Sequence, residues 1–414
     1  MKPSIPAILT RSLKTESPPD SKGAVGEVLS KALGGEGLSV EDGCVLLEAE
    51  PHELPAVFGA AWKVRRKAKG RKMTYSRKVF IPLTRLCRNA CAYCGFRRPP
   101  SPRSRLFLKP EEVLKIAAAG RNAGCTEALF TLGEKPEEKY PEAEKALSRM
   151  GYSSTLDYLA DLCQAVHEKT GLLPHSNPGV LSLKEMAALR EVNVSMGLML
   201  ENISPRLCQP GGPHEFSPGK HPHLRLATLE HAGKLRVAFT TGLLFGIGEK
   251  PRELVESLSV ISKLNREYGH VQEVILQPFA AKPRTPMGDH PEPEGLETLR
   301  VLAVSRLVLG GEMNLQVPPN LAASVASALP LAGANDWGGV SPVTLDHVNP
   351  EKAWPSIPKL RRITEGCGLE LRQRLPVYPE YVVDKPEFIP EALKPTVLGL
   401  VDGEGYVRRE KEAG

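Results

Sequence analysis

Short apolar runs alternate with amphipathic helical patterns over about 250 residues of this 414-residue chain, and this alternation is typical of strand–helix units. The apolar runs occupy residues 79–83, 128–132, 172–174, 194–200, 236–244, 271–276 and 313–317. The helical patterns occupy residues 109–123, 154–170, 182–192, 222–233, 251–268, 294–309 and 321–328. Strands that alternate with helices form parallel sheets with right-handed crossovers, so the sequence predicts an α/β fold. Seven units favour a TIM-like (β/α) barrel, either closed or partial, over an open sheet.

The segments on either side of this alternation have a different character. Residues 1–70 contain helical patterns at 25–33, 40–47 and 54–69. After about residue 330 the chain becomes rich in Pro and Gly, which predicts an irregular segment packed on a barrel face, followed by a tail. We therefore predict an N-terminal helical extension at 1–70, a barrel at 71–330 and a C-terminal segment with a tail at 331–414.

Composition and charge exclude several classes of protein. Aromatic residues make up 5% of the chain, which disfavours nucleic-acid binding by base stacking. A dense basic run lies between Lys63 and Lys78; such a run can grip phosphates, but we predict a solvated helix face or connector. No stretch of about 18 apolar residues occurs, so we expect no membrane span.

Cysteine usage and the first residues bear on the compartment. Residues 1–23 lack the apolar core of a secretory signal. Five cysteines are scattered along a long chain, which is unlike a disulfide framework and favours reduced thiols in a cytoplasmic protein. These five are Cys44, Cys125, Cys163, Cys208 and Cys367.

The remaining three cysteines are clustered in Thr-Arg-Leu-Cys-Arg-Asn-Ala-Cys-Ala-Tyr-Cys-Gly-Phe, residues 84–96. Cys87, Cys91 and Cys94 directly follow the first predicted strand, and catalytic groups of such barrels lie on the loops after the strands. Structural zinc takes four ligands, and no histidine occurs between His52 and His167. Three thiolates suit an iron–sulfur cube with one iron left open for another ligand.

The Cys-x3-Cys-x2-Cys spacing, with Tyr93 before the last cysteine, resembles the radical S-adenosylmethionine (SAM) superfamily. The resemblance implies that Cys87, Cys91 and Cys94 hold a [4Fe-4S] cluster. It implies further that SAM chelates the open iron through its amino and carboxylate groups. Tyr93 would then lie beside the adenine.

The segment Thr-Leu-Gly-Glu-Lys-Pro at residues 131–136 follows the second predicted strand and resembles the superfamily's Gly-Glu motif. The resemblance implies that Gly133 and Glu134 supply acceptors to the SAM ammonium, with Leu132 in place of the usual first glycine. The alternative is an ordinary turn after a strand.

Two further segments resemble SAM contacts of the superfamily. Glu201 follows the fourth predicted strand, where related enzymes place a polar contact to SAM, and Arg225 on the next helix can pair with the SAM carboxylate. Either residue could instead be an ordinary surface charge. The fifth strand continues into a glycine-rich segment at 242–249, in which Gly246 would let the backbone approach the adenine and Glu249 would brace the loop.

Four segments resemble the ring-closing subunit 1 of the 7,8-didemethyl-8-hydroxy-5-deazariboflavin (FO) synthase family. They are His-Ser-Asn-Pro-Gly at 175–179, Gln-Pro-Phe and its continuation at 277–287, Gln-Val-Pro-Pro-Asn-Leu at 316–321, and Gly-Ala-Asn-Asp-Trp-Gly-Gly-Val-Ser-Pro at 333–342. The resemblance implies a carbon–nitrogen lyase that acts on 5-amino-5-(4-hydroxybenzyl)-6-(ribitylimino)-dihydrouracil, the adduct of tyrosine and diaminouracil. A 5′-deoxyadenosyl radical would abstract hydrogen, and ring closure with loss of ammonia would follow. It also implies an adduct-forming partner subunit and an external electron donor.

Several polar residues near predicted strand ends are candidates for reading this small-molecule substrate. Uncharged side chains suit its uracil edge, ribityl chain and phenol. The binding candidates are Asn177, Gln277, Asn320 and Asn335, and the catalytic candidates are His175 and Asp336. The alternative for each is a hydrogen bond that fixes its own loop.

Other functions stay open on the residues alone. Related radical SAM enzymes share the cluster and the barrel: the adduct-forming partner, a menaquinone-pathway enzyme, and biotin-synthase-like or hydrogenase-maturation enzymes. An RNA-modifying enzyme could use the basic run, and salt-sensitive RNA binding would support it. A zinc-binding scaffold would contain zinc without iron or sulfide.

Overall fold

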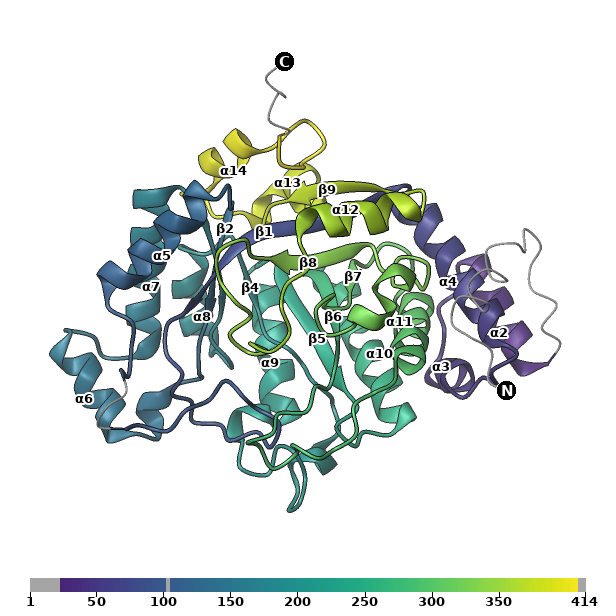
Figure 1. Cartoon of the computed structure of the whole chain (residues 1–414), viewed down its shortest axis with the longest axis horizontal. Coiled ribbons are helices and arrows are strands. Elements are labelled where there is room, and N and C mark those ends of the chain that lie inside the picture. Colours follow the sequence, from purple (N-terminus) through teal and green to yellow (C-terminus); the bar gives the residue numbers. More distant parts are fainter. Residues whose placement is uncertain (1–22, 102–104, 409–414) are drawn as a thin grey trace.

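The computed structural model of the chain describes residues 23–101 and 105–408 (Figure 1). Its centre is a closed barrel of parallel strands. The strands are β1 (Lys72–Pro82), β2 (Glu127–Thr131), β3 (Leu173–Asn177), β4 (Ser195–Gly197), β5 (Phe239–Phe245), β6 (Val271–Pro278), β7 (Leu315–Gln316) and β8 (Asp336–Val340). The ring closes because β1 pairs with both β2 and β8. The predicted TIM-like barrel is confirmed, and it is complete.

Helices follow most of the strands and cover the outside of the barrel (Figure 1). They are α5 (Pro110–Asn122), α6 (Pro141–Arg149), α7 (Thr155–Thr170), α8 (Leu183–Arg190), α9 (Pro222–Lys234), α10 (Pro251–Tyr268) and α11 (Gly295–Leu309). Ser154 and Ser182 cap the N-termini of α7 and α8 by accepting from backbone N–H groups. The helix expected at 321–328 is instead a 3₁₀ helix, Ala323–Ala328.

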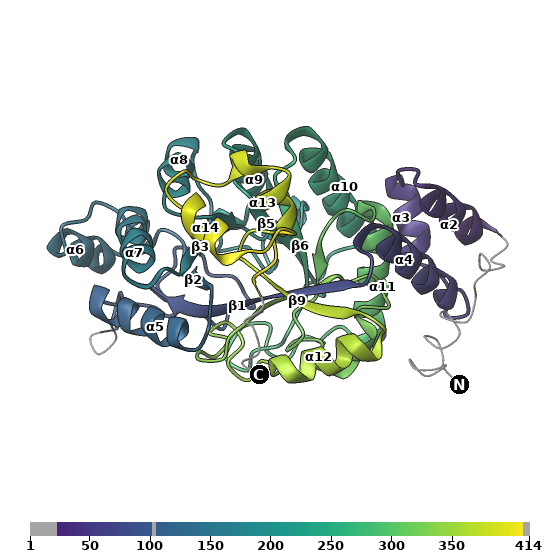
Figure 2. The same cartoon turned by 90° about the horizontal axis from the view of Figure 1, so that it is seen from above.

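The N-terminal helical extension forms α2 (Ala24–Gly34), α3 (Val40–Leu47) and α4 (Leu54–Lys69). A capping box at Ser39 begins α3, and Gly35 ends α2 in the left-handed conformation. The extension packs beside the barrel against α10 and α11 (Figure 2). Within the described ranges, no helix has the length and apolarity needed to cross a membrane.

The C-terminal stretch differs from the irregular segment that its composition predicts. It contains β8, β9 (Glu370–Arg374), α12 (Ile357–Gly366), α13 (Pro379–Val383) and α14 (Lys394–Leu400). β8 completes the barrel, so residues 331–414 include part of the barrel as well as elements packed against it. Trp337 of β8 is fully buried and donates a hydrogen bond to Thr364 of α12 at 3.0 Å.

β1 is longer than its neighbours and pairs with three strands. One stretch, Lys72–Ser76, pairs with β9, and the next, from Lys78, pairs with β2. After β9 the chain crosses the N-terminal mouth of the barrel. The carbonyl of Pro376 accepts hydrogen bonds from Ser195 (3.0 Å) and Gln272 (3.1 Å). The floor of the barrel is therefore covered by residues of the C-terminal segment.

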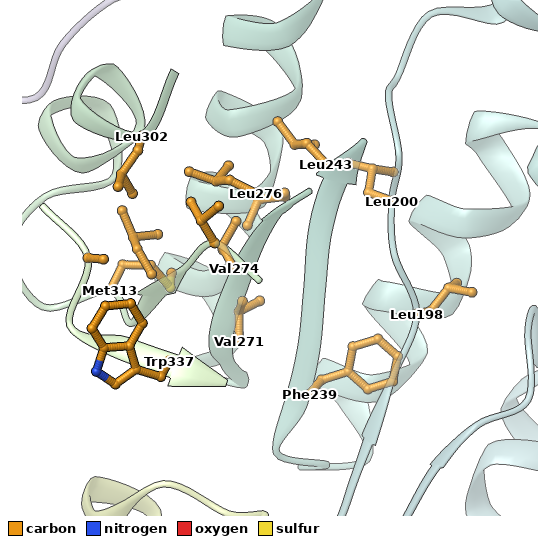
Figure 3. Packing of buried hydrophobic residues seen from close by; sticks show 14 of the residues in the cluster. Leu198, Leu200, Phe239, Leu243, Val271, Val274, Leu276, Leu302, Met313 and Trp337 are labelled. Atoms are coloured by element: carbon orange, nitrogen blue, oxygen red, sulfur yellow. The ribbon is translucent and has the colours of Figure 1, made fainter. Parts of the chain in front are cut away.

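Apolar side chains of the strands and the surrounding helices form a continuous core (Figure 3). Side chains labelled in Figure 3 come from β5, β6, β8, α11 and adjacent loops: Leu198, Leu200, Phe239, Leu243, Val271, Val274, Leu276, Leu302, Met313 and Trp337. Each buried side chain of this size contributes roughly 1.5–3 kcal/mol. This packing holds the strand ends, and with them the functional loops, in fixed positions.

The basic run between Lys63 and Lys78 is not one solvated face, contrary to expectation. Arg65 is 0% exposed and donates hydrogen bonds to the backbone carbonyls of Ala334, Gly70 and Lys72. Lys78 pairs with the buried Glu127 inside the barrel at 2.8 Å. Part of the run lies at the end of α4 and part lies on β1. Successive side chains of β1 point to opposite faces, so the charges of the run are dispersed.

Candidate active site

The three clustered cysteines lie on the long loop that leaves the C-terminal end of β1, the end at which barrel enzymes carry their chemistry. All three are free thiols, and each sulfur accepts a hydrogen bond. Glu134 N donates to Cys87 Sγ at 3.2 Å, Arg97 N donates to Cys94 Sγ at 3.4 Å, and Ser217 Oγ donates to Cys91 Sγ at 3.3 Å. Such hydrogen bonds tune the potential of a cluster held by thiolates.

The donor set fits a [4Fe-4S] cluster better than a single metal ion. Cys91 is close enough to Cys87 to raise its pKa, and Cys94 is close enough to Cys91 to do the same. Among the described residues, however, no three Cys, His, Asp or Glu side chains converge to hold one ion. A cube needs no such convergence because each thiolate binds its own iron. Burial raises the pKa of Cys87 to about 11, so binding iron must release its proton.

Gly133 brings the loop after β2 against the cysteine loop. Its N–H donates to Thr84 O at 3.0 Å, and a Cβ at this position would overlap the carbonyl of Leu86. A side chain here would push the two loops apart. Because Gly133 has no side chain, Glu134 N can reach Cys87 Sγ.

The carboxylate of Glu134 is buried beside the cysteine loop. It accepts hydrogen bonds from Arg88 Nε at 2.7 Å and from Val180 N at 3.2 Å. It also lies between Gly179 and Gly219, where an added Cβ would overlap it. The structure thus brings Gly133 and Glu134 together with Cys87.

Glu201 and Arg225 lie on the other side of the cysteine loop, after β4 and on α9. Glu201 is buried and paired with Lys220, and Arg225 Nη2 is 3.8 Å from its carboxylate. Burial would raise the pKa of Glu201, but Lys220 and Arg225 outweigh burial and lower it. Arg225 also donates to the carbonyls of Met199 (2.6 Å) and Gly219 (2.8 Å). Its Nε and Nη1 groups are therefore already engaged by the backbone.

Tyr93 faces the same group of charges. Its hydroxyl is 2.9 Å from His214 Nε2, and Lys220 Nζ lies 5.9 Å from the centre of its ring. Burial, reinforced by Lys220, lowers the pKa of His214 to about 3, so this imidazole is neutral at physiological pH. The ring of Tyr93 is therefore close to a cation, Lys220, that the sequence motifs did not identify.

The segment between Ser204 and His221 packs directly on the cysteine loop. Ala90 N donates to Phe216 O at 3.0 Å, and Gly219 N donates to Asn89 Oδ1 at 2.8 Å. Sequence reasoning missed the contributions of His214, Ser217 and Lys220, because no motif surrounds them. The available signal was an unusually long loop, rich in Gly, Pro and His, between β4 and α9.

Gly246 lies at the end of β5 with φ 84°, a conformation that favours glycine. An added Cβ would overlap Pro293. The carboxylate of Glu249 accepts hydrogen bonds from Gly246 N (2.6 Å) and Ile247 N (2.9 Å). Glu249 therefore braces this loop, as expected.

A cavity of about 170 Å³ lies inside the barrel, and it brings together His175, Asn177 and Gln277. His175 Nδ1 is 2.7 Å from Ser195 Oγ, and Nε2 is 3.1 Å from Asn177 Oδ1. Burial lowers the pKa of His175 to about 4, so it is uncharged at neutral pH. The lining also includes charged residues that sequence reasoning missed, namely Lys78, Glu127, Glu273 and Arg374.

The other predicted substrate residues are placed differently. Asn320 donates to Asp346 Oδ2 at 2.9 Å beside this cavity. Asn335 precedes β8 at the N-terminal end of the barrel, where its side chain accepts from Arg306 (2.8 Å) and donates to Asn314 (2.8 Å). The structure does not bring Asn335 to the cavity.

Asp336 lies at the floor of the barrel and is fully buried. It accepts from Arg374 Nε at 2.7 Å and from the hydroxyl of Thr74. Arg374 also reaches Glu273, which accepts hydrogen bonds from the hydroxyls of Tyr378 at 2.9 Å and Thr240 at 3.3 Å. Asp336 is thus part of a buried charge network at the barrel floor.

The sequence matches the family model described as the Radical SAM superfamily over residues 81–261. It is 54% identical over 336 residues to 7,8-didemethyl-8-hydroxy-5-deazariboflavin synthase of Methanopyrus kandleri, covering 81% of this chain and 100% of that relative. It is 46% identical to FO synthase of Streptomyces avermitilis over 90% of this chain, but spans only 45% of that longer protein.

Solved structures support the fold. The hydrogenase maturase HydG matches with a TM-score of 0.70 and 16% identity, covering 88% of this chain and 78% of that one. Methylornithine synthase (PylB) matches with a TM-score of 0.65 and 21% identity, covering 83% and 97%. With the cysteine loop, the barrel and the identity over a complete relative in agreement, the chain belongs to the 7,8-didemethyl-8-hydroxy-5-deazariboflavin synthase family of the radical SAM superfamily.

Proposed function

We propose that this chain forms the deazaflavin FO by closing the ring of 5-amino-5-(4-hydroxybenzyl)-6-(ribitylimino)-dihydrouracil with loss of ammonia. The observation that carries the proposal is the 54% identity over the whole length of a relative of that name. The cysteine loop at the C-terminal end of β1 supplies the thiols that such chemistry requires.

Cys87, Cys91 and Cys94 would hold the [4Fe-4S] cluster, and the open iron would take SAM. With an external electron donor, the bound cluster and SAM would supply the radical chemistry needed to abstract hydrogen from the substrate. Glu134 and Gly133 would offer acceptors to the SAM ammonium, and Tyr93 and Gly246 would border the adenine.

The carboxylate of SAM needs a cation. Arg225 was the sequence candidate, but its fork already donates to two backbone carbonyls. The ammonium of Lys220 pairs with Glu201 and lies beside the ring of Tyr93. We therefore add Lys220 to Arg225 and Glu201 as residues that would orient SAM.

The substrate would occupy the barrel cavity. His175, Asn177 and Gln277 present neutral hydrogen-bonding groups there, which suits a uracil edge, a ribityl chain and a phenol. The covered floor keeps water from entering beneath the reacting groups, and a carbon radical requires such shielding. His175, which lines the cavity, is the proposed group for proton transfer, and Asn320, which donates to Asp346 beside it, is a candidate for supporting the substrate. Asp336 is paired with Arg374 and Asn335 with Arg306 at the barrel floor, so neither is proposed to contact the substrate.

The decisive experiment uses protein reconstituted anaerobically with iron and sulfide. Reductant, SAM and the tyrosine–diaminouracil adduct are added, and 5′-deoxyadenosine and fluorescent FO are measured. We expect both products. Deoxyadenosine without FO would retain the superfamily chemistry and refute ring closure of this adduct.

A matched pair of cysteine variants tests the cluster assignment. Cys91→Ala should lose the iron–sulfur absorbance and both products. Cys367→Ala, which removes a half-buried thiol outside the loop, should retain them. Full turnover by Cys91→Ala would contradict the ligand assignment.

A further inference from the structure

A second hollow, of about 1090 Å³, lies outside the barrel where β1 changes partners. Pairing of β1 with β9 ends at Ser76, and pairing with β2 begins at Lys78. Arg77 stands between these two pairings. The end of α5 with the loop after it, Arg361 of α12, the middle of β9 and residues at and beyond the end of α14 complete the lining, so five separate parts of the chain meet at what we call the arginine cleft.

The arginine cleft is strongly cationic. Five arginines line it, Arg77, Arg121, Arg361, Arg372 and Arg408, and none of the described lining residues is acidic. Arg372 is neutralised by Asp402 at 2.6 Å. Within the described part of the chain, Arg121 and Arg361 are exposed and form no ion pair, so their charge faces the cleft uncompensated.

Two buried polar atoms of the lining have no hydrogen-bond partner among residues 23–101 and 105–408. They are Nε of Arg77 and Oγ1 of Thr126, and Thr126 is only 5% exposed. Buried donors of this kind are normally satisfied, by protein, water or ligand. The guanidinium of Arg77 lies over Gly124, where an added Cβ would come within 2.9 Å of Nη1. Gly124 therefore leaves room for Arg77 at the wall of the cleft.

We propose that the arginine cleft binds a small molecule through a phosphate or pyrophosphate group. The planar forks of Arg77, Arg121 and Arg361 match phosphate oxygens in pairs, and the hydroxyl of Thr126 adds a donor. The volume is that of a small-molecule site. The cations surround a hollow rather than following an extended track, which favours a small anion over a nucleic acid.

The arginine cleft is separate from the barrel cavity, so this proposal does not depend on the proposed function. Side chains alternate along a strand, and Tyr75 and Arg77 face the cleft while Lys78 and Phe80 face the cavity. No other residue of β1 lines either space.

Titration calorimetry on the full chain at low salt tests the proposal, with inorganic phosphate, pyrophosphate and ribose 5-phosphate as probes. These probes lack adenine, which keeps them from reporting on a SAM site. We expect pyrophosphate to bind. Arg77→Gln should weaken binding at least about tenfold, and Arg121→Ala and Arg361→Ala several-fold.

The matched control is Arg149→Ala. It removes the same charge from an exposed position at the end of α6, and it should bind as the unaltered protein does. Arg121 and Arg361 are exposed, so their variants keep the test valid if Arg77→Gln does not fold. The proposal is overturned if no probe binds, if Arg149→Ala weakens binding as much, or if RNA binds and pyrophosphate does not displace it.

Discussion

At the scale of single residues, Gly133 passes so close to the backbone of Leu86 that an added Cβ would overlap the Leu86 carbonyl. The two loops that meet there carry Cys87, a proposed cluster ligand, and Glu134, a proposed SAM acceptor. Their separation is therefore set by the absence of a side chain, and a small displacement of reacting groups has a large effect on rate.

Gly133→Ala should separate these loops. We expect a lower iron content after reconstitution and a fall on the order of 100-fold in 5′-deoxyadenosine formation. Gly37→Ala is the matched control, because an added Cβ there meets nothing within 4 Å. Normal iron content and turnover in Gly133→Ala would show that the loops can relax.

His270 gives a prediction about acid stability. Burial lowers its pKa from 6.5 to about 4, so the unfolded chain binds the extra proton between these pH values. The contribution of neutral His270 to the free energy of unfolding is therefore complete above pH 6.5 and is lost as pH falls toward 4. His270→Gln should reduce the loss of unfolding free energy across this window by about 3 kcal/mol in urea titrations. The unaltered protein is the reference, and an equal slope in the unaltered protein and in His270→Gln would refute the prediction.

Local residue patterns identified the clustered cysteines, but they did not identify all the residues that lie around them. The spacing of Cys87, Cys91 and Cys94 carries information because one loop holds all three. Lys220 and Ser217 reach the same place from a loop more than a hundred residues later, and local spacing does not encode that contact. Asn335 illustrates the reverse case, since its motif is distinctive but its side chain is engaged at the barrel floor.

At the scale of elements, β8 and β9 are joined by a buried charge pair between Asp336 and Arg374. Removing one partner leaves the other buried without compensation, so Arg374→Gln should lower the free energy of unfolding by about 3–5 kcal/mol. Lys394→Gln, which breaks an exposed pair with Glu391, should cost about 0–1 kcal/mol. Urea denaturation measures both, and equal costs would contradict the prediction.

Strand prediction succeeded for β1 to β7 and failed for β8 and β9, for identifiable reasons. The first seven include apolar runs that are buried in the barrel. β8 reads Asp-Trp-Gly-Gly-Val and β9 reads Glu-Leu-Arg-Gln-Arg, so neither resembles a buried parallel strand. Arg374 and Asp336 become acceptable there because they neutralise each other.

At the scale of the whole molecule, the barrel depends on residues far along the chain. A chain that ends at residue 330 lacks β8, and β1 and β7 lose their shared neighbour. We expect such a fragment to show no cooperative thermal transition by circular dichroism and to expose apolar surface to a fluorescent dye. The full chain, treated identically, should melt cooperatively. A cooperative transition of the fragment would support the predicted boundary at residue 330.

β1 also constrains how this protein can diverge. Arg77 and Lys78 are adjacent, yet one lines the arginine cleft and the other the barrel cavity. Inserting or deleting a single residue within the strand would exchange these two orientations along part of its length. Insertions or deletions in β1 are therefore compatible with both spaces only when they involve an even number of residues. A change of one residue would turn Arg77 toward the barrel cavity or Lys78 toward the arginine cleft.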